Sequence, residues 1–222
     1  MIDLVAEAAA PTAARALLAD LPKLHHWGGE DQVGGLNSVI GDRMIRELGR
    51  YDSPRVIETG AGATTLLFSC LDPGALVSIA PSPELRDRIF AEAIARQISL
   101  KRLFFTCERS ELALPRIAAD RNRFDVGLID GSHNWPCVFV DFCYLNMMMP
   151  ADGTLFVDDI HLYSVSQLFH LLLQQEEFEH VAVDDKMATF RKLVDRPFLP
   201  EWHREAYLAE NSPVQLTAGE AP

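Results

Sequence analysis

From position 55 onward, the sequence alternates between short β-like runs and longer helical ones. Five β-like runs, VIE, ALVSIA, KRLFFT, FDVGLID and GTLFVDD, are each followed by a segment of helical pattern. Strand–helix units in succession favour a mostly parallel sheet with helices on both faces. The central strands are continuously apolar, as expected when both faces of a sheet are covered. We therefore predict a three-layer, doubly wound α/β fold.

Two further β-like runs follow the last helical segment, FEHVAVD at 178–184 and MATFRKL at 187–193. Only a short link separates them, so they can pair as an antiparallel hairpin. We predict that this hairpin forms one edge of the sheet.

The N-terminal region differs from the repeating part. An alanine-rich run at 4–21 and a second segment at 42–49 have helical patterns, and an irregular stretch rich in His and Gly lies between them. We interpret residues 1–50 as an N-terminal helical cap, 51–195 as the α/β domain and 196–222 as a C-terminal tail. His25 and His26 in the irregular stretch either fold over a site as a lid or tether the cap.

Charge and cysteine content limit the partners and the compartment. The formal net charge of −12 repels a polyanion, and no Lys/Arg cluster offsets it, so a nucleic acid is disfavoured and a small substrate is favoured. The four cysteines form no CxxC pair, which is typical of reduced thiols in a cytoplasmic protein. We expect no membrane span and no secretory signal. The sequence leaves open whether the chain forms a homo-oligomer.

A glycine loop follows the first strand of the repeating part. Residues 58–65 read ETGAGATT, so a strand ends at Glu58, two glycines form a turn, and a helix begins near Thr64. Glycine allows a sharp turn and the close approach of a ligand. A dinucleotide site would have a third glycine where this chain has Thr65, which argues against a pyrophosphate-binding oxidoreductase.

The string E-x-G-x-G-x-x-T resembles the first motif of the S-adenosylmethionine (SAM)-dependent methyltransferases with the Rossmann-like fold. The resemblance implies a seven-stranded sheet whose last strand is antiparallel. It also implies that Glu58 organises the methionine end of SAM, although a solvated strand end is an alternative for Glu58. The cofactor-binding residues implied in this way are Glu58, Gly60, Ala61, Gly62, Thr64, Ser110 and Asp130.

Two acidic blocks end the fourth and fifth predicted strands, LIDGSH at 128–133 and FVDDIH at 156–161. Ligands of open α/β sheets bind outside the carboxyl ends of the strands, so these blocks should converge beside the glycine loop. Together with Asp152 and Gly153, they resemble a subgroup of small bacterial methyltransferases.

Similarity to the catechol-type O-methyltransferases implies that Asp130, Asp158 and Asp159 bind Mg²⁺ or another divalent cation. Carboxylates suit such a hard cation. In the alternative, Asp158 or Asp159 caps the next helix and Asp130 contacts only the cofactor. His133 is the first candidate for the catalytic base, because its ordinary pKa lies near neutrality, and Asp130 is the second. A histidine hydrogen-bonded to a neighbouring strand end is the alternative for His133.

The chain departs from the methyltransferase pattern after the second predicted strand, where relatives carry an acidic residue for the ribose and this chain has Ala80. Ser82 or Glu84 could substitute for it, or cap the next helix. Ser110 has the same two readings, a contact with adenine or a helix cap. We therefore predict a SAM-dependent methyltransferase that acts on a small-molecule acceptor, on oxygen rather than on nitrogen or carbon. The alternative is a non-catalytic SAM- or nucleoside-binding protein of the same fold.

Overall fold

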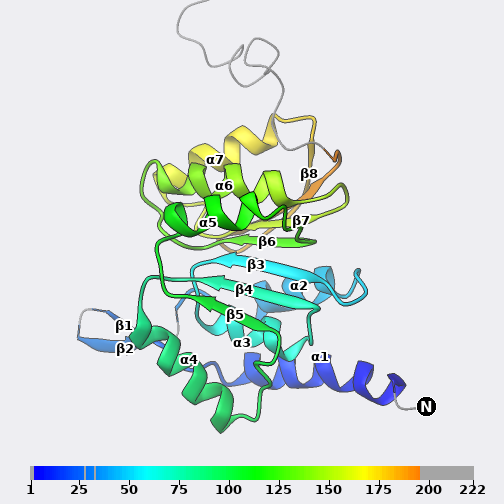
Figure 1. Cartoon of the computed structure of the whole chain (residues 1–222), viewed down its shortest axis with the longest axis vertical. Helices are drawn as coiled ribbons and strands as arrows, with labels where there is room; N and C mark the ends of the chain where they lie inside the picture. The colour runs from blue at the N-terminus through cyan, green and yellow to red at the C-terminus, as the bar shows by residue number, and fades with distance from the viewer. Residues whose placement is uncertain (1–2, 28, 33, 196–222) are drawn as a thin grey trace, which may run out of the picture.

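The computed structural model describes residues 3–27, 29–32 and 34–195; the predicted C-terminal tail at 196–222 lies outside the described residues. Its centre is a seven-stranded sheet (Figure 1). The strands, in spatial order, are β5 (Leu103–Thr106), β4 (Ala75–Ile79), β3 (Arg55–Thr59), β6 (Val126–Ile129), β7 (Thr154–Val157), β9 (Met187–Lys192) and β8 (Phe178–Asp184). The first five strands are parallel, and β9 is antiparallel to both of its neighbours. The predicted doubly wound sheet and its hairpin are confirmed.

Helices cover both faces of this sheet. Figure 1 shows α5, α6 and α7 together on one side and the helices α1 to α4 on the other. The helices are α1 (Asp3–Ala19), α2 (Ser38–Leu48), α3 (Ala63–Cys70), α4 (Pro83–Ala95), α5 (Ser110–Ala119), α6 (Cys137–Met148) and α7 (Tyr163–Leu173). Among the described residues, none of these helices is long and apolar enough to cross a bilayer.

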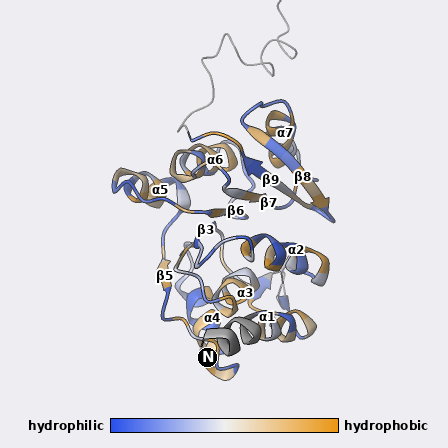
Figure 2. Ribbon diagram, turned by 90° about the vertical axis from the view of Figure 1, so that its right-hand side faces the viewer, coloured by the Kyte–Doolittle hydropathy of each residue, from blue (hydrophilic) through white to orange (hydrophobic). Residues whose placement is uncertain are grey.

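The central strands contribute to two separate hydrophobic cores. Val56 is buried in one core together with α1 to α4, while its neighbour Ile57 is buried in the other with α5 to α7. Successive side chains of a strand point to opposite faces, so a strand covered on both sides is mostly apolar, and any polar side chain in it needs a buried partner. The edge strand β8 has one open side, and it contains both hydrophilic and hydrophobic stretches (Figure 2).

The N-terminal cap packs on the same core as α3. Leu17 of α1 and Met44 of α2 are almost fully buried in the cluster that contains Leu66 of α3. The stretch between these helices was predicted to be irregular, but it forms a short hairpin of β1 (His25–Trp27) and β2 (Glu30–Gln32). The strands have only three residues each, too few for a clear alternating pattern.

A buried ion pair joins the cap to the sheet. Arg191 of β9 donates to Oε2 of Glu47 in α2 at 2.5 Å and to Oγ1 of Thr154 at 2.6 Å. The hydroxyl of Tyr51 accepts a further hydrogen bond from Arg191 at 3.0 Å. Because both side chains of the ion pair are only 5% exposed, neither charge has water available as a substitute partner.

We expect Glu47→Gln to lower the free energy of unfolding by about 3 kcal/mol, because it leaves the Arg191 guanidinium buried without its counter-charge. Urea unfolding measures this loss. The matched control is Asp87→Asn, which removes an exposed partner of Arg86 and should leave the stability unchanged. Equal stabilities of the two variants would contradict the structural role of the buried pair.

Candidate functional site

The parallel register brings four strand ends to one line. Thr59 of β3 pairs with Ile79 of β4 on one side and with Ile129 of β6 on the other, and Ile129 pairs with Val157 of β7. The loops that follow these residues therefore leave the sheet at the same edge, which is where open α/β sheets bind ligands.

A cavity of about 840 Å³ lies at this edge, within the size range of small-molecule sites. Its walls come from the glycine loop, the loops after β4, β5, β6 and β7, the N-terminal segment and the turn between β8 and β9. The lining residues among those described are His25, Gly34, Gly35, Gly60, Ala61, Ile79, Ala80, Pro81, Leu85, Arg109, Ser110, Glu111, Asp130, Gly131, Ser132, His133, Asn134, Asp159 and Lys186.

Glu58 lies beneath the glycine loop and is completely buried. Its Oε1 accepts hydrogen bonds from the hydroxyls of Thr65 at 2.5 Å and Ser78 at 2.6 Å, and its Oε2 accepts one from Thr64 at 2.7 Å. Burial raises the pKa of Glu58 to about 7, although the three hydroxyls oppose the shift. The carboxylate thus fixes the end of β3, the first turn of α3 and strand β4 to one another.

The two glycines of the loop serve different purposes. Gly60 has φ +88°, and a Cβ at this position would collide with the backbone carbonyl of Asp130. Only a glycine allows both this conformation and this approach of β3 to β6. Gly62 begins α3, and a Cβ there would lie 2.7 Å from Nε2 of His25, so the N-terminal hairpin closes directly over the loop.

The residues predicted to contact the cofactor divide into two groups. Four line the cavity: Gly60, Ala61, Ser110 and Asp130. Three lie outside its lining: Glu58, Gly62 and Thr64. Thr64 donates to Glu58 and Gly62 is covered by His25, so all three are placed to shape the loop. Direct contact of these residues with a cofactor stays a prediction.

The cavity wall after β4, where the methyltransferase pattern has an acidic residue that binds the ribose, is apolar in this protein. Ala80, Pro81 and Leu85 line the cavity after β4. Ser82 instead caps α4, since its hydroxyl accepts from the amide of Leu85 at 3.1 Å, and it donates to Glu84 at 3.1 Å. Capping is therefore the arrangement found for Ser82, and Glu84 lies in the first turn of α4 and accepts the Ser82 hydroxyl.

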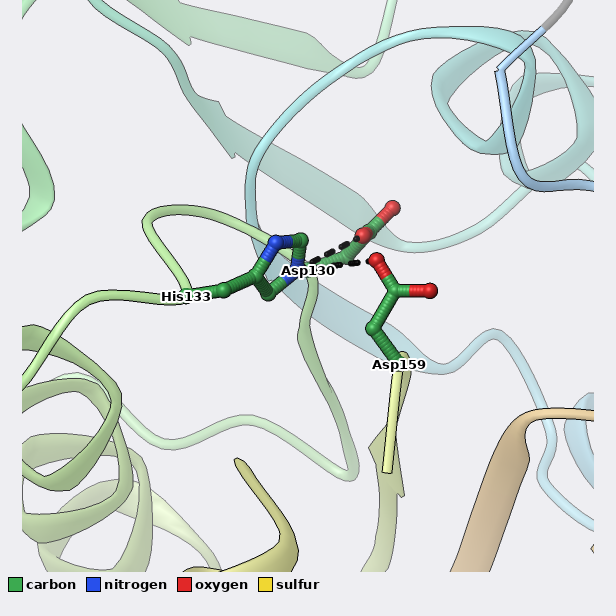
Figure 3. Close-up of side chains that lie close together, drawn as sticks. All are labelled: Asp130, His133 and Asp159. Carbon is green, nitrogen blue, oxygen red and sulfur yellow. Dashed lines mark ion pairs between the residues drawn. The ribbon is translucent and has the colours of Figure 1, made fainter. Parts of the chain in front are cut away.

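His133 lies between two carboxylates at the cavity wall (Figure 3). Its Nε2 is 3.6 Å from Oδ1 of Asp130 and 3.3 Å from Oδ2 of Asp159. The nearby carboxylate of Asp130 and the negative charges of Asp159 and Asp158 raise the pKa of His133, and burial opposes them. The hydroxyl of Ser164 donates to the backbone carbonyl of His133 and holds the loop against α7.

The predicted metal ligands do not come together as a set of three aspartates. Asp159 has a left-handed backbone (φ +58°), which Asp tolerates, and it is Asp159 that lies with Asp130 and His133. Asp158 is almost buried and lies 3.2 Å from the ammonium of Lys186, which also pairs with Asp159. An imidazole beside two carboxylates, one of them already neutralised by an ammonium, does not fit Mg²⁺, which prefers oxygen ligands.

Sequence reasoning missed Lys186 as a site residue and left the role of His25 open. His25 covers Gly62, and burial lowers its pKa despite the nearby charge of Asp130. Lys186 lies in the link between the two strands of the hairpin. Because β8 runs in the direction of β7, this link lies at the edge where the other strands end. The direction of β8 was the signal that could have identified it.

The strand order and the position of the glycine loop are those of the Rossmann-like SAM-dependent methyltransferase fold. No protein-family model and no curated protein matches this sequence. Solved structures of methyltransferases do resemble it. The O-methyltransferase TomG from Streptomyces achromogenes, in complex with SAM, is 16% identical with a TM-score of 0.60, over 83% of this chain and 89% of that chain.

Two further structures have the same fold. An O-methyltransferase from Bacillus cereus in complex with S-adenosylhomocysteine (SAH) is 14% identical with a TM-score of 0.58, over 85% of this chain and 91% of that one. MycE from the mycinamycin biosynthetic pathway, in complex with Mg and SAH, is 17% identical with a TM-score of 0.56, over 76% of this chain and 53% of its own. At such identities the similarity establishes the fold alone.

The buried carboxylate gives a pH-dependent prediction. The pKa of Glu58 in the folded protein, about 7, exceeds the ordinary 4.5, so the folded state keeps a proton that the unfolded chain loses. The free energy of unfolding should therefore fall as the pH rises from about 4.5 to about 7, by up to about 1.4 kcal/mol per unit for this group. Asp141, with a pKa of about 6, and Asp158, with a pKa of about 7, act in the same direction.

Glu58→Gln should weaken this dependence, because the amide does not titrate. Urea unfolding at about pH 5 and about pH 7 measures the difference, and Glu179→Gln on the exposed side of β8 is the control. If Glu58→Gln kept the full pH dependence of the wild type, burial of an ionisable Glu58 would be refuted.

Proposed function

We propose that this protein is a SAM-dependent methyltransferase that transfers a methyl group to an oxygen of a small-molecule acceptor. The observation that carries the proposal is one cavity whose wall contains both the glycine loop and a histidine held by two carboxylates. Complexes of the fold neighbours TomG with SAM and of the Bacillus cereus enzyme with SAH support the choice of cofactor.

The walls of the cavity fit the cofactor. Gly60 and Ala61 have small side chains or none, so a ligand can approach their backbone closely. Ile79 and Ala80 provide an apolar surface for a nucleoside, and Ser110 supplies a hydroxyl. When bound, SAM supplies a methyl group on a positively charged sulfur. The residues that line the cavity after β4 are apolar, so no carboxylate from that loop would bind the ribose. Other contacts would hold it.

His133 is the proposed base. Asp130 and Asp159 both face Nε2, so they favour the tautomer with the proton on Nε2, and Nδ1, which points away from both carboxylates, is then free to accept a proton (Figure 3). Nδ1 would take the proton of the acceptor hydroxyl as its oxygen forms the new bond to carbon and the carbon–sulfur bond breaks. The two carboxylates would stabilise the imidazolium until it releases the proton to water.

The acceptor is proposed to be a small molecule and not a nucleic acid. The chain has a net charge of −12, and the carboxylates of Glu111, Asp130 and Asp159 line the cavity. A phosphate backbone at this cavity would meet repulsion. The four unpaired cysteines support a place in the cytoplasm.

We expect Ala61→Leu to weaken SAH binding at least about tenfold, because the larger side chain crowds the glycine loop at the cavity wall. Isothermal calorimetry with SAH measures the affinity. Ala95→Leu at the end of α4, outside the cavity lining, is the matched control. If wild type and Ala61→Leu bound SAH equally well, the cofactor site would be elsewhere.

We expect His133→Ala to lower kcat at least about 100-fold while the affinity for SAH stays within a factor of about two. Turnover is measured as SAH release with hydroxylated acceptors found in a panel screen. His170→Ala changes an exposed histidine of α7 and should keep full activity. Full activity of His133→Ala would exclude it as the base, and tight SAH binding without any turnover in the wild type would favour the non-catalytic binding protein.

A further inference from the structure

A lysine reaches into the cavity from the last hairpin of the sheet. Lys186 follows β8, and its Nζ lies 3.2 Å from Oδ2 of Asp158 and pairs even more closely with Oδ1 of Asp159. Burial lowers the pKa of Lys186, but the hydrogen bond with Asp159 and the charge of Asp158 outweigh burial and raise it. One ammonium thus pairs with two adjacent carboxyl groups.

The main chain fixes the position of this ammonium. The backbone carbonyl of Lys186 accepts from the amide of Ile160 at 3.0 Å, which ties the turn to the loop after β7. The two residues before Lys186 are held by α2 and by its N-cap residue. Arg43 of α2 donates to Asp184 at 2.6 Å, and the N-cap Asn37 donates to Asp185 at 2.8 Å. The N-terminal cap therefore holds the turn that carries Lys186.

The space around the ammonium is closed on its other side by Gly35. A Cβ on Gly35 would collide with Nζ of Lys186 and would lie 3.2 Å from Oδ2 of Asp158. The ammonium of Lys186 thus lies between two chain segments that are far apart in the sequence, one at Gly35 and the other at Asp158 and Asp159. Such a fitted position distinguishes this lysine from a surface lysine that pairs with whichever carboxylate is near.

The ammonium competes with a divalent cation for the same oxygens. Asp130, His133 and Asp159 each offer one ligand atom within 4.8 Å of the others, which is the geometry of a possible metal site. Asp159 is also the closer partner of Lys186, and Asp158 is turned to Lys186 as well. A cation bound here would face the ammonium at short range, where like charges in a partly buried site repel strongly.

We propose that Lys186 is the resident cation of this site: it takes the charge-balancing place that a divalent cation would take at the strand-end carboxylates, and it excludes that cation. Resting on the proposed function, this means that methyl transfer by this chain needs no metal. Lys186 acts as a positioning residue, since it holds Asp159 against His133.

The test is a titration of the full chain with Mn²⁺, in which the electron paramagnetic resonance signal of the free ion measures how much ion is bound. The wild type should show no binding below about 1 mM, whereas Lys186→Met should bind one Mn²⁺ at least about tenfold more tightly, because the carboxylates lose their counter-charge. Adding Asp159→Asn to Lys186→Met should abolish the gained site. Lys101→Met removes a lysine paired with Asp72 near the start of β5, at the opposite edge of the sheet, and should behave as the wild type.

Two results would overturn the proposal. One is a wild-type protein that binds Mn²⁺ below about 1 mM and loses that binding on Asp159→Asn. The other is a Lys186→Met protein that keeps the wild-type melting temperature and gains no Mn²⁺ site. Calorimetry with SAH, run on the same samples, reports separately on the proposed function, so the failure of either idea can be recognised.

Discussion

The hydrogen bonds of the buried Glu58 carboxylate hold together the elements on which the site depends. Three hydroxyls, from the first turn of α3 and from β4, point at one carboxyl group at the end of β3. The group is completely buried, so losing the Thr64 hydroxyl would leave Oε2 unsatisfied, and losing the hydroxyl of Thr65 or Ser78 would leave Oε1 with a single partner. The glycine loop above it is therefore shaped from beneath, and the cavity wall is formed by backbone whose position does not depend on a bound ligand.

The chemistry at the opposite wall depends on the alignment of neighbouring strands. Asp130 follows β6 and Asp159 follows β7, and the parallel register of these strands places the two carboxylates on either side of His133. The turn between β8 and β9 adds Lys186 at the same edge, because β9 returns antiparallel to β7. A base, two carboxylates and an ammonium are thus assembled from segments that each contribute one or two residues.

Much of this arrangement was predictable. The apolar runs gave the strands, the glycine loop gave the position of the cavity, and the two acidic blocks gave Asp130, His133 and Asp159 at its wall. The orientation of individual side chains was not predictable. Asp158 and Asp159 are adjacent and chemically identical, and the left-handed backbone of Asp159 decides which of them faces His133. Likewise, Glu58 carries a signal for a ligand contact in its motif, yet hydroxyls from two other elements enclose it.

The sequence by itself determined the class of fold, because the spacing of apolar residues fixes which segments become strands covered on both faces and which become helices. It also determined where the chain turns sharply after β3, since only a glycine at position 60 permits that backbone conformation. Only the tertiary structure decided which residues from distant segments lie against one another. The contacts that join such segments are those of His25 with Gly62, of Lys186 with Asp158 and Asp159, and of Arg191 with Glu47. The residues in each contact are far apart in the chain, so the local sequence around any one of them does not indicate its partner.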